Sequence, residues 1–73
     1  MPLNYTQHAQ GRIQQRGLSL AEVEAAVEND DNPWEHVLNG GNHLRYFYSN
    51  VTVITNKAGD LVVTVWRGER GGW

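Results

Sequence analysis

Residues 8–17 of the chain read His8-Ala9-Gln10-Gly11-Arg12-Ile13-Gln14-Gln15-Arg16-Gly17. Residues four positions apart lie on one face of a helix, so a helix here places His8, Arg12 and Arg16 in one row. Ala9 and Ile13 lie one position further round and form an apolar side that can dock on a core. The pattern therefore predicts a short helix that carries an imidazole and two guanidinium groups beside its buried side.

Both ends of this helix are marked by residues that favour helix termini. Thr6 is a suitable N-cap, because its hydroxyl can accept a hydrogen bond from a first-turn amide. Gly17 suits the left-handed conformation that ends many helices, and Leu18 can then fold back on Ile13. Gly11 costs about 1 kcal/mol relative to alanine inside a helix, but it leaves backbone open to a ligand.

A second helix follows directly, and its start is the clearest local signal in the sequence. Ser19-Leu20-Ala21-Glu22 is a capping box, with Ser19 as the N-cap and Glu22 as the third helical residue. Leu18 and Val23 flank the box with the spacing of a hydrophobic staple. We predict this helix from about residue 20 to residue 28, ended by a polar turn.

From Trp34 onward the apolar residues follow the period of β-strands. Strands are predicted at residues 34–38, 44–48, 51–55 and 61–67, separated by turns rich in Asn, Gly and Ser. The last two strands are the most apolar and are expected in the centre of the sheet. Helices followed by strands indicate an α+β fold, here two N-terminal helices packed on one face of a four-stranded antiparallel sheet. The glycine-rich segment 68–73 is expected to form a flexible tail.

Length and composition limit the classes of protein to which the chain can belong. Seventy-three residues predict a single domain, 1–73, and the absence of cysteine excludes disulfides and cysteine-rich zinc sites. No apolar run approaches the roughly 18 residues of a membrane-spanning helix, and the first residues lack the pattern of a signal peptide. His36 and His43 lack metal-ligand spacing with His8, so neither a metal nor a cofactor is expected. We therefore expect a soluble, cytoplasmic protein with no membrane contact.

The charges are unevenly distributed along the chain. The formal net charge of −2 argues against simple affinity for nucleic acid, since phosphate binding depends on clustered Lys and Arg. However, an acidic block spans residues 22–35, and all five arginines lie outside it: Arg12, Arg16, Arg45, Arg67 and Arg70. A fold that gathers these arginines would present a basic site on an acidic body.

Taken together, these residues resemble a known family. His8-Ala9-x-x-Arg12-Ile13-x-x-Arg16-Gly17-Leu18-Ser19, an acidic helix and the late strand Val62-Val63-Thr64-Val65-Trp66 are similar to the pattern of the DUF4258 domain. The resemblance extends from about Tyr5 to Arg67, and it departs mildly at Ile13, where methionine is usual. DUF4258 is grouped with the barnase/EndoU/colicin/RelE-like superfamily, in which a helical layer precedes a four-stranded antiparallel sheet.

The resemblance implies metal-independent cleavage of RNA, often by a toxin that has a cognate inhibitor protein. By position it implies catalytic roles for His8, Arg12 and Thr64, and it also matches Arg16. Such cleavage needs a base for the 2′-hydroxyl proton, an acid for the leaving oxygen and cations on the phosphorane, which are tasks for histidine and arginine. Arg16, Arg45, Tyr46 and Trp66 are therefore our candidates for substrate binding, with the aromatic rings as base-stacking surfaces.

The alternation along the last strand makes a geometric prediction. Thr64 should share a face with Val62 and Trp66, while Val63 and Val65 point the other way. We expect Thr64 to converge with His8 and Arg12 on one concave surface.

Each candidate also has a purely structural reading. His8 can be an exposed residue at a helix start, Arg12 can pair with an acidic side chain of the second helix, and Arg16 suits a helix C-terminus. Thr64 is also a common β-former. The rival hypothesis for the whole chain is a non-catalytic protein–protein interaction module on the same fold.

Overall fold

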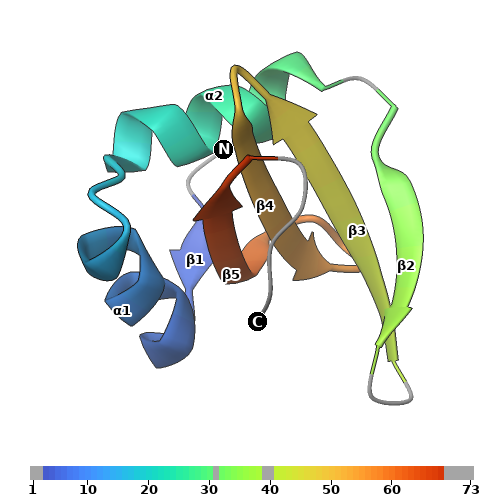
Figure 1. The fold of residues 1–73 in the computed structure, drawn as a ribbon. Helices are drawn as coiled ribbons and strands as arrows, with labels where there is room; N and C mark the ends of the chain where they lie inside the picture. The colour runs from blue at the N-terminus through green and yellow to red at the C-terminus, as the bar shows by residue number, and fades with distance from the viewer. Residues whose placement is uncertain (1–2, 31, 39–40, 69–73) are drawn as a thin grey trace.

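The structure is a computed structural model of the 73-residue chain, and it describes residues 3–30, 32–38 and 41–68. The elements follow in the order β1 (Asn4–Tyr5), α1 (Gln7–Gln15), α2 (Leu20–Asn29), β2 (Trp34–Leu38), β3 (Gly41–Tyr48), β4 (Val51–Asn56) and β5 (Leu61–Arg67) (Figure 1). The strands form one sheet in the order β1-β5-β4-β3-β2.

The predicted α+β class is confirmed, but the sheet has a fifth strand. Strands β2 to β5 pair antiparallel, as expected, whereas β1 pairs with β5 in parallel. Asn4 N–H donates to the Asp60 carbonyl over 2.8 Å, and Thr6 N–H donates to the Val62 carbonyl over 3.1 Å. A two-residue strand is too short to show any alternation, so the sequence pattern could not reveal β1.

The predicted helix boundaries are confirmed by the capping bonds. The Thr6 hydroxyl accepts a bond from Ala9 N–H at the start of α1 and donates one to the Val63 carbonyl of β5. At the start of α2, Ser19 and Glu22 form the complete capping box. Gly17, with φ of +65°, turns the chain between the two helices.

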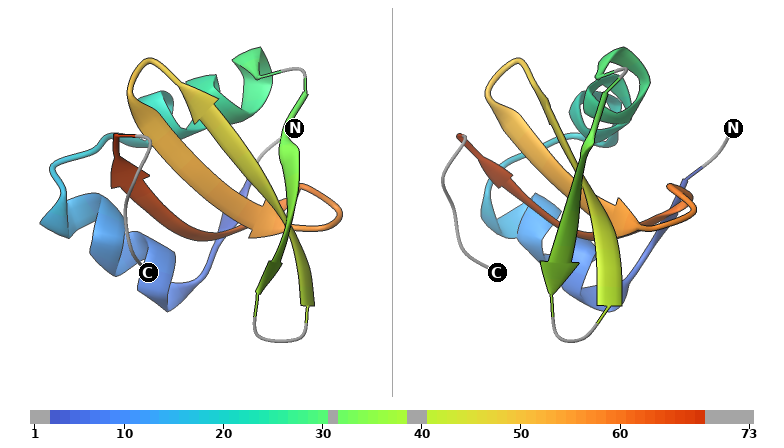
Figure 2. Two further views of the ribbon diagram at one scale, coloured as in Figure 1. Left: turned by 45° about the vertical axis from the view of Figure 1, so that its right-hand side comes forward. Right: turned by 90° about the vertical axis from the view of Figure 1, so that its right-hand side faces the viewer.

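The helices and the sheet share one core. Helix α1 packs mainly against β5, while α2 packs against β3 and β4 (Figure 2). Helix α1 contributes Ala9 and Ile13 as predicted, and α2 contributes Val23 and Ala26, whereas Leu20, also expected on the core face of α2, is 53% exposed. The strands add valines and one tyrosine; the buried cluster is Ala9, Ile13, Leu18, Val23, Ala26, Tyr46, Val51, Val53, Val62 and Val65. No helix in the described parts of the chain has the length and apolar character needed to cross a membrane.

One detail of the predicted alternation in β5 is wrong. Thr64 pairs with Ile54, but Val62 pairs with the next residue, Thr55, because the register shifts at this point. Neighbouring residues of β4 point to opposite faces, so Val62 lies on the core face and Thr64 on the other. The irregularity reverses the expected phase: Val62 shares the core with Val65 and does not share a face with Thr64.

The end of β5 is fixed by hydrogen bonds. Gly68 N–H donates to the Asn50 carbonyl over 2.7 Å, and the Gly68 carbonyl accepts a bond from the Thr52 hydroxyl over 2.6 Å. Gly68, the first residue of the segment 68–73 predicted to form a flexible tail, is therefore hydrogen-bonded to β4 and to the turn before it. The rest of that predicted tail, residues 69–73, lies outside the described residues.

Candidate functional site

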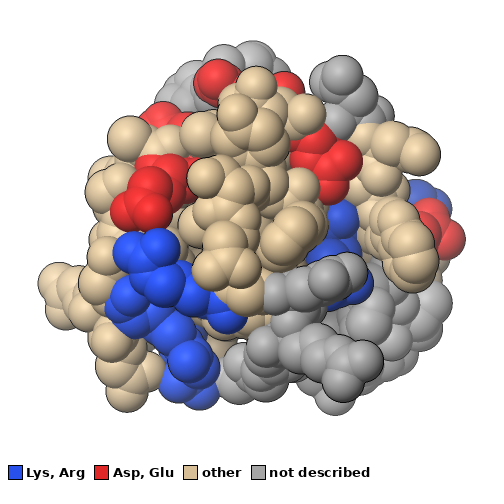
Figure 3. Space-filling view, turned by 45° about the horizontal axis from the view of Figure 1, so that its top comes forward, with Lys and Arg blue, Asp and Glu red and all other residues tan. Residues whose placement is uncertain are grey.

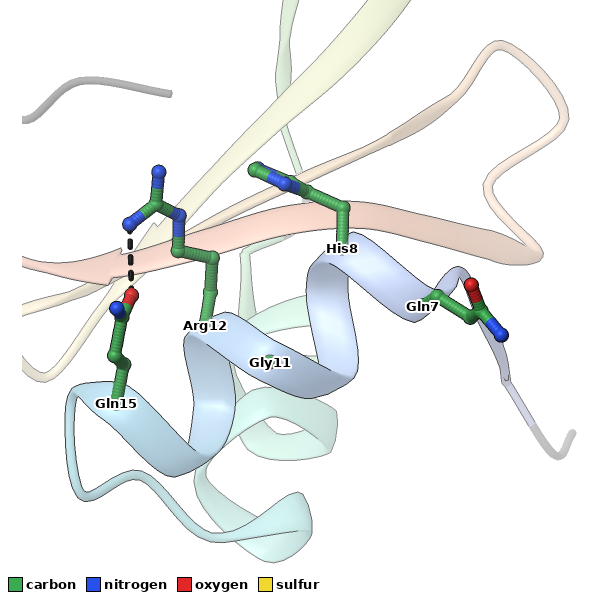
Figure 4. Close-up of a pocket in the computed structure, with 5 residues that line it drawn as sticks. All are labelled: Gln7, His8, Gly11, Arg12 and Gln15. Atoms are coloured by element: carbon green, nitrogen blue, oxygen red, sulfur yellow. Dashed lines mark hydrogen bonds between the residues drawn. The ribbon is translucent and has the colours of Figure 1, made fainter.

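His8 and Arg12 line the same surface cavity on helix α1. The cavity has a volume of about 340 Å³, and its walls are Gln7, His8, Gly11, Arg12 and Gln15. Figure 4 shows the imidazole and the guanidinium projecting from one side of the helix, a turn apart. Two of the three residues in the predicted row, His8 and Arg12, thus share one surface cavity, whereas Arg16 does not line it.

The burial pattern of α1 explains why these two side chains reach the surface together. Ala9 and Ile13 are buried against the sheet, which leaves His8 exposed and Arg12 half-buried at the border of the core. Arg12 Nη1 donates to Gln15 Oε1 over 2.8 Å, a bond that restricts the position of the guanidinium beside the cavity (Figure 4). A Cβ atom added at Gly11 would meet no atom within 4 Å, so the space beside the helix backbone is open at this point.

Arg67 is a residue whose importance the sequence interpretation missed. From the end of β5, its Nη2 donates to the Gly17 carbonyl over 3.0 Å and its Nε to the Arg16 carbonyl over 3.4 Å. Its Nη1 lies 3.3 Å from Glu22 Oε2, in an ion pair. Arg67 therefore ties the end of α1 and the start of α2 to the last strand.

Charges of both signs adjoin at this end of the helices. Figure 3 shows one large group of Lys and Arg atoms with acidic atoms directly beside it, and smaller groups of Lys and Arg atoms elsewhere on the same face. The Ser19 backbone N–H is the main cause that lowers the pKa of Glu22, and Arg67 lowers it further. The Glu22 carboxylate thus serves both the capping box and the ion pair.

Thr64 and Trp66 lie on the face of β5 that points away from the core. Successive register pairs across four strands place Trp34, Arg45, Ile54 and Thr64 in one row, and Phe47, Thr52 and Trp66 in the next row. We call this the second face of the sheet. Its residues were predicted separately as strand residues, and only the register shows that they line up.

The second face contains two buried polar atoms without a hydrogen bond. Thr64 is 0% exposed, and within the described structure neither its Oγ1 nor Nε1 of Trp66 has a partner. Leaving a buried polar group unpaired costs about 1–3 kcal/mol, so such atoms are uncommon in folded proteins. A hydroxyl and an indole N–H, two positions apart on one strand, are thus both buried without a hydrogen bond.

The remaining candidates are distributed over three places. Tyr46 is 7% exposed and packs in the core, on the opposite side of β3 from Arg45. Arg45 lies on the second face beside Trp34, and Arg16 is exposed at the end of α1. The structure thus brings His8 and Arg12 into one cavity, while Thr64 and Trp66 lie on the strand against which that helix packs.

Trp34 is the second residue that the sequence interpretation missed. Its side chain is 72% exposed, the largest value among the exposed hydrophobic residues described. The available signal was its position immediately after Pro33, at the start of a short strand. That signal marks a strand terminus but does not distinguish an exposed ring from a buried one.

The described residues contain no group of three or more His, Cys, Asp or Glu side chains that could hold a metal ion. Comparison of the chain with protein-family models, with curated proteins and with solved structures gives no match. The site must therefore be interpreted from its own geometry.

Proposed function

We propose that the protein is a metal-independent endoribonuclease of the toxin type, which acts on cytoplasmic RNA by general acid–base catalysis. The observation that carries the proposal is the shared cavity of His8 and Arg12. The resemblance of the sequence from Tyr5 to Arg67 to DUF4258 also supports it. A toxin of this kind requires a cognate inhibitor protein in the cell that makes it.

The chemistry proposed for this cavity needs only the two side chains and the RNA. The His8 imidazole takes the proton of a 2′-hydroxyl, whose oxygen then forms a bond to the adjacent phosphorus. Arg12 donates hydrogen bonds to the phosphorane oxygens, where negative charge accumulates. The imidazolium returns the proton to the 5′-oxygen as the bond from phosphorus to that oxygen breaks. The products are a 2′,3′-cyclic phosphate and a free 5′-hydroxyl.

Thr64 enters this proposal through its unpaired hydroxyl. Its Oγ1 is buried on the second face, so a phosphate oxygen can reach it only if that face opens. Such a contact would supply the hydrogen bond that the hydroxyl lacks in the described structure.

The test is cleavage of single-stranded RNA in the presence of EDTA. His8→Ala is expected to lower the rate by about 10²–10⁴-fold, the usual contribution of a general acid–base group. Arg12→Lys should also lower the rate, because an ammonium cannot make the bidentate contact of a guanidinium. Gln14→Ala, an exposed residue of α1 outside the cavity wall, is the matched control and should cleave normally. Wild-type protein that leaves RNA intact from mildly acidic to neutral pH would overturn the proposal.

The second candidate is a non-catalytic protein–protein interaction module. The observation in its favour is the exposure of large apolar side chains, above all Trp34 and Leu20. This function predicts no turnover of RNA and a His8→Ala protein that is indistinguishable from wild type in every binding assay.

A further inference from the structure

A second cavity lies beside the first residue of β2, where the α2–β2 connection reaches the sheet. Its walls are Asp30, Asn32, Trp34, Arg45 and Phe47, and its volume is about 230 Å³. Ligand pockets for drug-sized molecules usually exceed about 300 Å³, so this cavity suits a single planar ring better than a larger ligand.

The aromatic walls come from adjacent strands and face the same way. Trp34 pairs with Arg45 across β2 and β3, and Phe47 lies two residues further along β3, so all three belong to the second face. Trp34 is 72% exposed and Phe47 is 39% exposed, although both lie on a folded sheet. Exposed rings beside an arginine are typical of surfaces on which unpaired bases stack.

The polar wall is held in place by the backbone of β3. Asp30 Oδ2 accepts a bond from Phe47 N–H over 2.9 Å, and Asp30 Oδ1 accepts one from Asn32 N–H over 3.1 Å. The bond to Phe47 fixes the α2–β2 connection to β3. Phe47 lies beyond the last residue of β3 that pairs with β2. Asn32 and Asp30 thereby bring an amide and a carboxylate to the edge of a ring bound at Trp34, and a carboxylate can accept further bonds from amino groups of a base.

We propose that this cavity binds one unpaired base of single-stranded RNA, stacked on Trp34, with the Arg45 guanidinium at the adjoining phosphate. The inference rests on the proposed function only in taking RNA as the ligand, since the cavity shares no residue with that of His8 and Arg12. A protein partner is the less favoured occupant, because a charged or amide group lines three of the five wall positions. The site would hold the strand at a distance from the cleaved bond and raise affinity without taking part in the chemistry.

The experiment measures binding of a labelled single-stranded DNA hexamer of adenine by fluorescence anisotropy. DNA lacks the 2′-hydroxyl, so binding is measured without cleavage. Trp34→Ala is expected to weaken binding by about 5- to 150-fold, which corresponds to about 1–3 kcal/mol for one base–aromatic stack. Trp34→Phe should keep most of the affinity, and duplex RNA should compete poorly because its bases are already stacked.

Tyr48→Ala is the matched control. Tyr48 lies on the same strand as Phe47 and is 44% exposed, but it pairs with Val51 of the core and lies outside the cavity. Its removal should leave binding unchanged. Equal affinities of the wild type and Trp34→Ala, or no binding of the hexamer at all, would overturn the inference.

A cleavage assay separates this inference from the proposed function. Binding that depends on Trp34 in a protein that cleaves nothing would keep the base site and overturn the nuclease. Cleavage that depends on His8, with a KM that Trp34→Ala leaves unchanged, would keep the nuclease and overturn the base site. If both hold, Trp34→Ala raises KM and leaves kcat near the wild-type value, whereas His8→Ala lowers kcat and leaves binding of the hexamer intact.

Discussion

Thr64 combines complete burial with an unpaired hydroxyl, which makes its substitution informative. Thr64→Val keeps the β-branched shape and removes the unpaired group, so the free energy of unfolding should rise by about 1–3 kcal/mol. If the hydroxyl also reaches the substrate, the cleavage rate should fall in the same variant. Urea denaturation and the RNA cleavage assay measure the two effects.

The two measurements on Thr64→Val divide the structural and functional explanations. A more stable variant with unchanged cleavage would assign Thr64 to the sheet alone. A variant less stable than the wild type would mean that the Thr64 hydroxyl does make a hydrogen bond in the folded protein. Thr52, also buried on the second face but bonded to the Gly68 carbonyl, supplies the control: Thr52→Val should lower the stability, because it removes a bond that is made.

At the scale of single residues, the sequence predicted those roles that depend on near neighbours. The spacing of His8 and Arg12 was sufficient to predict their common face, because both lie within one helix. The role of Arg67 was not predictable, since its carbonyl partners Arg16 and Gly17 lie 51 and 50 positions away. A contact of that kind exists only after the strand and the helices have been placed together.

At the scale of elements, the capping box of α2 leads to a prediction about pH. The folded protein holds the pKa of Glu22 below its ordinary value, first through the Ser19 backbone N–H and then through Arg67. The stabilisation is therefore complete above the ordinary titration range of a glutamate and is lost as the pH falls through the lowered pKa. Glu22→Gln keeps a residue that can close the box but removes the charge.

The difference in stability between wild type and Glu22→Gln should consequently be largest near neutral pH and shrink under acid. Urea denaturation midpoints at a series of pH values check this. A difference that stays constant down to acid pH would mean that the charge of Glu22 contributes nothing, and that the box acts through neutral hydrogen bonds alone.

In the strands, alternation of residue types predicted the side-chain faces only where the register is regular. Alternation predicted the opposite faces of Thr64 and Val65 correctly, but it failed at Val62, because the register shift in β5 inserts one residue. The sequence Val62-Val63 is apolar at both positions, so no change of residue type marks the shift. The cavity at Trp34 was hidden for a related reason, since its walls combine a loop and two strands.

At the scale of the whole molecule, Arg67 joins the end of α1 and the start of α2 to β5. Arg67→Ala should lower the free energy of unfolding by about 1–2 kcal/mol, because it removes bonds to two carbonyls as well as an exposed ion pair of small value. Arg67→Lys should restore little, since one ammonium cannot span these acceptors. Lys57→Ala, an exposed residue of the β4–β5 turn, is the control and should unfold like the wild type in urea.

The two proposed ligand sites lie on different parts of this small body. The cavity of His8 and Arg12 belongs to α1, and the cavity of Trp34 belongs to the far strands of the sheet, with β5 and β4 between them. A formal net charge of −2 gives the molecule no overall electrostatic attraction for RNA, so under the proposal stacking at Trp34 would supply affinity that net charge does not.

The parallel pairing of β1 with β5 also determines when the cavity of His8 and Arg12 can form during synthesis. Asn4 pairs with Leu61, so the first strand must wait until residues 61–67 have left the ribosome before it has a partner. Helix α1 packs mainly on that same late strand, and Thr6 bonds to it at Val63. During most of its synthesis, the growing chain therefore contains His8 and Arg12 but lacks β5, the strand against which their helix packs. Under the proposed function, the protein could cleave RNA only once β5 has folded, and an inhibitor would have the period of translation in which to be made.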